Sequence, residues 1–134
     1  MSSECVQESP RVLNVIEAAV PASVPKLRHR AREFAAAQGG GKRLVADVAL
    51  AVSEAVTNVV KYAYDHGVDG SIELTAEAAG DYLEIWVKDR GPGFGSGSED
   101  GLGLGLSIIA RLCEDIKIIQ EGDGTEVRMR FALA

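Results

Sequence analysis

The sequence predicts an α+β domain, a two-layer α/β sandwich in which helices cover one face of a largely antiparallel sheet. Segments with helical and with strand periodicity alternate along the chain without an internal repeat. Neighbouring strand-like segments are joined by short glycine-containing turns, which favour antiparallel hairpins. The length of 134 residues suits one hydrophobic core. We therefore expect a flexible N-terminus over residues 1–10 and a single domain over residues 11–134.

The N-terminal part predicts a strand and then a helix. Residues 11–19 alternate along the chain, with apolar side chains on both faces, as in a strand. Ser23 is a candidate N-cap and Pro25 suits a first helical turn, so a helix is expected over 24–37. Its apolar positions follow the helical spacing and are Leu27, Ala31, Phe34 and Ala35. The glycines of Gln38–Gly41 end it.

The middle of the chain predicts a buried helix and a hairpin. A helix over 42–64 carries apolar residues at helical spacing: Leu44, Val48, Ala51, Val52, Ala55, Val59 and Ala63. A turn-forming cluster follows at 65–70. Residues 71–76 and 82–89 then alternate as two strands, which the turn Ala79-Gly80-Asp81 joins as a hairpin.

The C-terminal part begins with an irregular segment, residues 90–101, rich in Gly, Pro, Ser and acidic residues. Compact domains seldom keep so long a segment unless it is functional or mobile. A third helix is expected over 104–112, followed by strands at 116–120 and 126–133 around a turn at 121–125.

Composition excludes several classes of protein. Hydrophobic residues make up 46% and charged residues 25%, as in soluble globular chains, and no apolar run is long enough for a membrane span. The net charge of −6 disfavours direct nucleic-acid binding. The acidic N-terminus does not look like a secretory signal, so a cytoplasmic location is expected. Cys5 and Cys113 lack the spacing of a zinc site.

The second predicted helix carries an unusual polar stripe. Glu54, Asn58 and Lys61 stand at i, i+4 and i+7 and therefore share one helical face, which Tyr62 borders. A carboxylate can hold a proton or a water, an amide oxygen can bind a hard metal ion, and an ammonium can reach a phosphate. The alternative is a solvated helix face with an incidental ion pair.

Two glycine-rich motifs follow. Asp89 ends a predicted strand before Gly91 and Gly93, so a flat ligand with an exocyclic amine, such as adenine, would find an acceptor beside bare backbone. An ordinary turn is the alternative. The run Gly101-Leu102-Gly103-Leu104-Gly105 then leads into a helix, whose free N–H groups suit phosphate oxygens. Its spacing does not match a dinucleotide-binding fold, and Gly39–Arg43 does not match a P-loop.

These motifs, in this order and with Gly124-Thr125 before the last strand, resemble the ATP-binding domain shared by gyrases, histidine kinases and related ATPases, the GHKL family with its Bergerat fold. The run from Ala51 to Asn58 is most similar to the anti-sigma factor serine/threonine kinases of the RsbW and SpoIIAB type. The resemblance extends from about residue 11 to 131 and implies Mg-ATP held between the second helix and a lid over 90–104.

The resemblance also implies residue roles. Asn58 would coordinate Mg²⁺, and Glu54 would be the general base or orient the nucleophile. Lys61 would contact phosphate, and Tyr62 would border the pocket. Asp89 would accept the adenine amine, with Thr125 supporting it through water. The glycine motifs would complete the ATP site, and their residues are Gly91, Gly93, Gly101, Gly103, Leu104 and Gly105.

The implied activity is transfer of the ATP γ-phosphoryl group to a serine of a STAS-domain anti-anti-sigma protein by a kinase that also sequesters a sigma factor. A homodimer is expected from the same resemblance. Tyr62 departs from it, since these kinases often have His there, and the Asn58–Lys61 spacing is that of histidine kinases. A nucleotide-dependent binding module with little kinase activity is the alternative, and Glu54 favours the enzyme.

Overall fold

The computed structural model describes residues 11–64, 69–91, 99–121 and 124–133, with backbone only for 99–105 and 121. Five strands form one sheet in the order β1-β2-β3-β5-β4, and every neighbouring pair is antiparallel. The strands are β1 (Val12–Ala18), β2 (Ser71–Ala79), β3 (Tyr82–Asp89), β4 (Asp115–Glu121) and β5 (Gly124–Ala132). The predicted α+β class and largely antiparallel sheet are confirmed.

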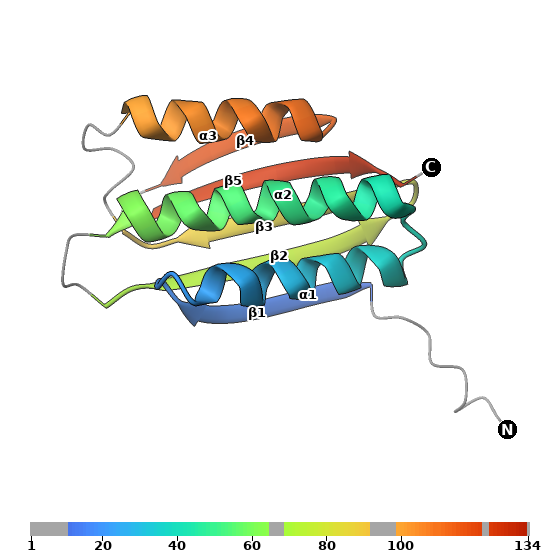
Figure 1. Ribbon diagram of the computed structural model, residues 1–134, viewed down its shortest axis with the longest axis horizontal. Helices are drawn as coiled ribbons and strands as arrows, with labels where there is room; N and C mark the ends of the chain where they lie inside the picture. The colour runs from blue at the N-terminus through green and yellow to red at the C-terminus, as the bar shows by residue number, and fades with distance from the viewer. Residues whose placement is uncertain (1–10, 65–68, 92–98, 122–123, 134) are drawn as a thin grey trace, which may run out of the picture.

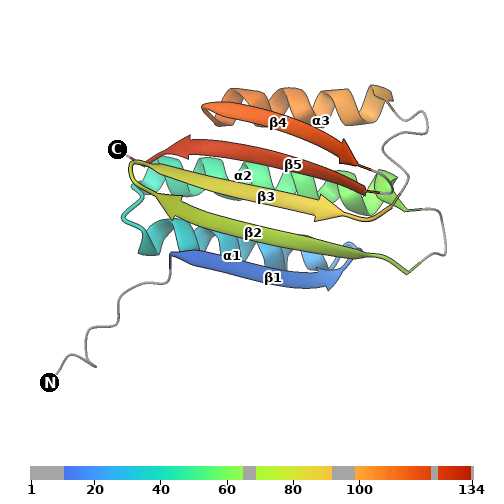
Figure 2. The same ribbon diagram turned by 180° about the vertical axis from the view of Figure 1, so that it is seen from behind.

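The helices α1 (Ser23–Ala37), α2 (Lys42–Asn58) and α3 (Glu99–Leu112) lie on one face of the sheet (Figure 1). Seen from behind, the opposite face carries no helix in the described part of the chain (Figure 2). The molecule is therefore the two-layer sandwich that the sequence predicts. Within the described ranges, no helix has both the length and the apolarity needed to cross a bilayer.

The core lies between the two layers because alternate strand residues point toward the helices. The predicted stripe of α1 is buried throughout, and in α2 the central apolar residues are fully buried. The largest fully buried side chains come from both layers: Leu27, Val48, Val52, Val56, Val59, Ile72, Leu74, Leu83, Ile85, Ile109, Met129 and Phe131.

Two predicted helix starts differ from the structure. Ser23 does not cap α1: its N-cap residue is Ala22, and the Ser23 hydroxyl donates to the carbonyl of Ala18 over 2.6 Å instead. The hydroxyl thus ties the end of β1 to the first turn of α1. Helix α3 begins at Glu99 rather than near Leu104.

Candidate functional site

One end of the sheet brings together three buried polar residues. Asn58 is the last residue of α2, Asp89 is the last residue of β3, and Thr125 is the second residue of β5. The ends of these elements lie at the same side of the molecule (Figure 1). All three side chains are nearly inaccessible, with exposed fractions of 5%, 1% and 4%. Polar groups are seldom buried without a reason, so this end is a candidate site.

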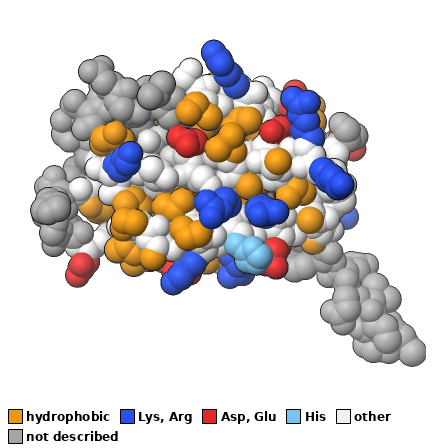
Figure 3. All heavy atoms as spheres, viewed as in Figure 1, with side chains coloured by type: hydrophobic (Ala, Val, Ile, Leu, Met, Phe, Trp, Pro, Cys, Tyr) orange, Lys and Arg blue, Asp and Glu red, His pale blue; other side chains and the backbone are white. Residues whose placement is uncertain are grey.

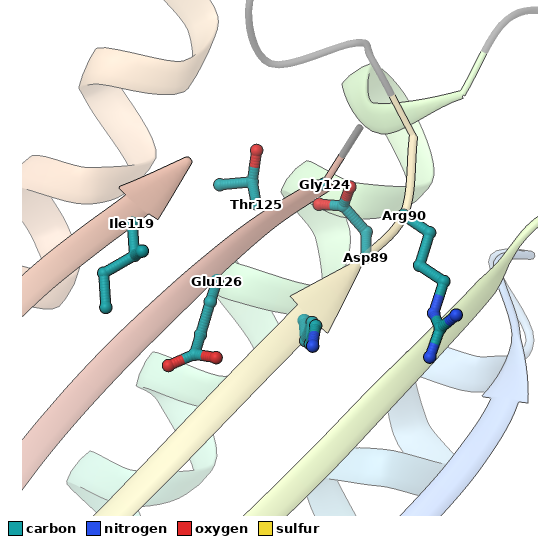
Figure 4. Close-up of a pocket in the computed structure, with 7 residues that line it drawn as sticks. Asp89, Arg90, Ile119, Gly124, Thr125 and Glu126 are labelled. Carbon is teal, nitrogen blue, oxygen red and sulfur yellow. The ribbon is translucent and has the colours of Figure 1, made fainter. Parts of the chain in front are cut away.

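Asp89 and Thr125 are direct cross-strand partners in the β3–β5 ladder. Figure 4 shows their side chains at adjacent strand ends, while Glu126, the next residue of β5, points away from them. The backbone N–H of Gly91 donates to Oδ1 of Asp89 over 2.9 Å. Burial raises the pKa of Asp89 from 3.8 to about 6, and hydrogen bonds from the backbone of Gly91 and Thr125 limit the rise.

Two buried polar atoms at this end have no hydrogen-bond partner among the described residues: Nδ2 of Asn58 and Oδ2 of Asp89. An unsatisfied buried group costs roughly 1–3 kcal/mol, and native proteins keep few of them. One is a donor and the other an acceptor, and each belongs to a residue that the sequence singles out. This end of the fold is therefore built to meet polar groups from outside the described chain.

The end of α2 is not regular. A π-helical turn, η2 (Val59–Ala63), follows Asn58, so the predicted α-helix over 42–64 is wrong in its last turn. A π-turn has i→i+5 hydrogen bonds and is wider than an α-turn, which rotates Lys61 and Tyr62 away from the positions that α-spacing gives. Lys61 is exposed, Tyr62 is half-buried against the core, and Glu54 is half-buried one turn before Asn58.

The segment after β3 lies directly against this π-turn. A Cβ atom added to Gly91 would lie 1.9 Å from the carbonyl oxygen of Ala63. Only glycine fits such an approach. A Cβ on Gly124 would similarly meet the carbonyl oxygen of Asp89 at 2.5 Å. Glycine at these two positions lets the end of η2 and the ends of β3 and β5 pack closely together.

Tyr64 belongs to this site although the sequence did not single it out. Its hydroxyl accepts hydrogen bonds from the backbone N–H groups of Arg90, at 2.9 Å, and Ser71, at 3.3 Å. It also donates to the carbonyl of Ser71 over 2.8 Å. The ring lies where a Cβ on Gly70 would be, 2.4 Å from its nearest atoms. The close Tyr64–Gly70 pair is a tertiary contact, which no local sequence pattern indicates.

The glycine-rich predictions are only partly described. Gly93 lies outside the described residues. Gly101, Gly103, Leu104 and Gly105 lie within the first two turns of α3 rather than before it, which corrects the predicted helix start. Free N–H groups therefore belong to the residues around Glu99, since the first four N–H groups of a helix lack partners. Among the described residues, no three His, Cys, Asp or Glu side chains gather as for a metal ion.

A cavity of about 220 Å³ lies beside the same strand ends (Figure 4). Asp89 and Thr125 of the candidate site line it, and none of the described residues of α2 or η2 does. The other lining residues are Lys88, Arg90, Ile119, Gly124 and Glu126. It therefore opens on the sheet face opposite the helices. The cavity thus reaches the Asp89 and Thr125 part of the candidate site, whereas Asn58, at the end of α2, does not line it.

Residues 18–131 match the family model of the histidine kinase-like ATPase domain. The chain is 32% identical to the serine-protein kinase RsbW of Listeria innocua, over 72% of this chain and 71% of that protein. It is 29% identical to the anti-sigma F factor of Shouchella clausii, over 56% of this chain and 60% of the relative.

A crystal structure of the RsbU and RsbW domains of a Mycobacterium tuberculosis protein superposes with a TM-score of 0.77 at 27% identity. The match covers 92% of this chain and 33% of that one. The chain thus spans about 60% of one curated relative that it matches and a third of this solved chain. With a family model that matches most of its length, the chain belongs to the histidine kinase-like ATPase domain family, of the GHKL group.

Proposed function

We propose that this chain binds Mg-ATP at the end of the sheet formed by α2, η2, β3 and β5. The observation that carries this proposal is the pair of unpartnered buried atoms, Nδ2 of Asn58 and Oδ2 of Asp89. Membership of an ATPase domain family names the ligand that would satisfy them. The residues fit it: the carboxylate of Asp89 is suited to an adenine amine, and the Nδ2 group of Asn58 can donate to a phosphate oxygen while its amide oxygen faces a hard metal ion.

The residue roles follow from their chemistry. Asp89 would accept the exocyclic amine of adenine at Oδ2, which lets the base replace the missing partner. Gly91 and Thr125 keep the carboxylate in place by backbone hydrogen bonds. Asn58 would hold the magnesium ion, whose chemistry at the site would be to neutralise phosphate charge. Lys61, exposed on the π-turn, would reach phosphate oxygens from outside.

We further propose that the reaction is transfer of the γ-phosphoryl group to a serine of a STAS-domain anti-anti-sigma protein, and that the chain also sequesters a sigma factor. The names of the relatives support this, since they are called serine-protein kinase and anti-sigma factor. Glu54 supports the enzyme over a pure binding module. It lies one turn before Asn58, with no hydrogen-bond or ion-pair partner among the described residues, and would receive the serine proton.

Phosphoryl transfer from γ-labelled ATP to a purified STAS-domain partner tests the kinase. Wild-type protein should label the partner, and Glu54→Gln should lower the rate by about two orders of magnitude or more while Mg-ATP still binds. Equal rates would reject Glu54 as the base. Binding of ATP without any labelling would identify a nucleotide-dependent binding module, and absence of ATP binding by calorimetry would reject both.

A homodimer through the open face of β1, β2 and β3 is also proposed. Val12 and Ile16 of β1 are more than half exposed on this face, beside the half-buried Trp86 of β3. The face also carries both signs of charge, for example Glu73 and Lys88, so opposite charges can meet across a two-fold axis. Light scattering should give twice the monomer mass, and Ile16→Lys should lower it. A monomeric wild-type protein would contradict the proposal.

A further inference from the structure

A groove of about 630 Å³ runs between α1 and α2 on the outer side of the helix layer. Small or short side chains form its floor: Ala36 from α1 and Val45, Ala46 and Ala49 from α2. Leu50 stands at its side with 46% of its surface exposed. Three alanines in the groove between two packed helices leave space that larger residues would fill.

The end of the groove is closed by the turn between the helices. Gly40 lines it there, and a Cβ on this residue would lie 2.9 Å from both the carbonyl oxygen of Ala35 and Cδ2 of Leu44. The turn is therefore tightly packed at this end of the groove. It lies along the N-terminal part of α2, whereas the nucleotide site proposed above lies at the opposite end of that helix.

Basic side chains line the edges of this apolar floor. Arg32 of α1 and Lys42 of α2 both line the groove and are exposed, and neither has an ion-pair partner among the described residues. One turn away, the guanidinium of Arg28 lies 3.5 Å from the hydroxyl of Ser53. Figure 3 shows the Lys and Arg side chains that gather over α1 and the adjoining part of α2, with hydrophobic side chains beside them.

The acidic residues nearest in these helices form no ion pair with Arg32 or Lys42. Glu33 lies 3.2 Å from His29, and Asp47 lies 4.0 Å from Arg43. The local charge is therefore positive, although the whole chain has a net charge of −6. A basic, apolar groove on an acidic protein indicates a surface selected for an anionic, partly apolar occupant.

We propose that this groove binds a short amphipathic helix of a partner protein, with apolar anchors at i, i+4 and i+7 and acidic residues on their flanks. The apolar anchors would lie over the alanine floor beside Leu50, and the acidic flanks would meet Arg32 and Lys42. Helix-in-groove recognition uses this pattern. An extended anionic surface, such as a membrane or nucleic acid, is disfavoured because the net charge of the chain would repel it.

Two synthetic peptides of about 18 residues, long enough for about five helical turns, test the proposal. Both carry leucines at the anchor positions, and they differ only in Glu or Lys on the flanks. Binding is followed by fluorescence anisotropy and by amide shifts of the labelled protein in NMR spectra. The acidic peptide should bind and should shift the amide signals of Ala36, Ala46 and Ala49. Its affinity should fall as the salt concentration rises. The basic peptide should bind at least about tenfold more weakly.

A double charge reversal tests whether the peptide binds in this groove. Arg32→Glu combined with Lys42→Glu should lower the affinity for the acidic peptide at least about tenfold. Arg30→Glu, an exposed change on α1 outside the groove lining, should leave its affinity unchanged. Equal binding of the two peptides, shifts confined to other elements, or insensitivity to the double reversal would overturn the proposal. If the protein binds phosphatidylglycerol vesicles and the double reversal abolishes that binding, the occupant of the groove is a lipid surface and not a peptide. None of these outcomes depends on ATP.

Discussion

The hydroxyl of Tyr64 accepts a hydrogen bond from the backbone N–H of Arg90 over 2.9 Å. This bond joins the residue after η2 to the residue after β3, and the same hydroxyl also bonds both the N–H and the carbonyl of Ser71 in β2. Asp89 lies immediately before Arg90. One side chain thus connects the helix that carries Asn58 with the strand that presents Asp89.

Tyr64→Phe should destabilise the fold by about 1 kcal/mol, because these hydrogen bonds are exposed and water replaces part of each. It should lower the affinity for Mg-ATP several-fold, because Arg90 and the neighbouring Asp89 are then held less firmly in position. Urea unfolding and calorimetry measure the two effects. Tyr82→Phe is the matched control, since Tyr82 lies at the other end of β3 and its ring contact with Arg130 does not need the hydroxyl. Unchanged affinity in Tyr64→Phe would show that Tyr64 has only a structural role.

Gly91→Ala should be more damaging than any other single methyl addition in the described loops. The new Cβ would lie 1.9 Å from the carbonyl oxygen of Ala63, and the rigid backbone there must move. We expect a loss of about 3 kcal/mol and a loss of ATP binding. Gly41→Ala is the control, because a Cβ there meets nothing within 4 Å, and thermal unfolding compares the two. Similar melting temperatures for the two variants would contradict the close approach.

Ser23→Ala should cost about 1 kcal/mol of unfolding free energy. Ser23 is 2% exposed and its hydroxyl donates to the carbonyl of Ala18 over 2.6 Å, so the variant loses this hydrogen bond, while the carbonyl keeps the one from the N–H of Val20. Ser53→Ala is a suitable control, because the Ser53 hydroxyl bonds the carbonyl of Ala49 within its own helix, a bond that adds little, and its contact with Arg28 is long, at 3.5 Å. Chemical denaturation gives both values, and an equal small effect would mean that Ser23 does not anchor the β1–α1 junction.

The sequence predicted the features that depend on periodicity. The buried stripe of α1, the core of α2 and the hairpin of β2 and β3 all follow from the spacing of apolar residues and from a turn with Gly80, whose φ is +63°. These features are local, so a single sequence contains them. Asp89 and Thr125 are partners on adjacent strands, and their role in one ATP site stays a prediction.

The remaining features leave no trace in the spacing of apolar residues. The π-turn after Asn58 is a change in backbone hydrogen bonding that keeps the apolar pattern intact. The sequence places the start of α3 too late because glycine usually destabilises a helix, whereas this helix contains the glycines Gly101, Gly103 and Gly105. Ser23 was predicted as a cap from its type alone, but Ala18 takes its hydrogen bond. Tyr64 and Gly70 meet only after the chain folds.

Asp89 should give ATP binding and stability opposite responses to pH. Burial raises its pKa from 3.8 to about 6, so the folded state binds a proton more tightly than the unfolded chain does. The stability that this proton contributes is complete below pH 3.8 and is lost as pH rises through about 6. At about 1.36 kcal/mol per unit, the ionised form costs at most about 3 kcal/mol. ATP affinity, in contrast, should fall below pH 6, because the ionised oxygen accepts the adenine amine.

Asp89→Asn separates these two effects. Above pH 6 the variant should unfold at a higher urea concentration than the wild type, because it buries no charge, and the difference should shrink toward pH 4. It should bind ATP at least about tenfold more weakly, since an amide that keeps its oxygen on the N–H of Gly91 turns a donor toward the adenine amine. Asp81→Asn, in the exposed β2–β3 turn, should change neither property. Wild-type affinity in Asp89→Asn would remove Asp89 from the adenine site, and lower stability at pH 7 would show that its carboxylate has a partner in solution.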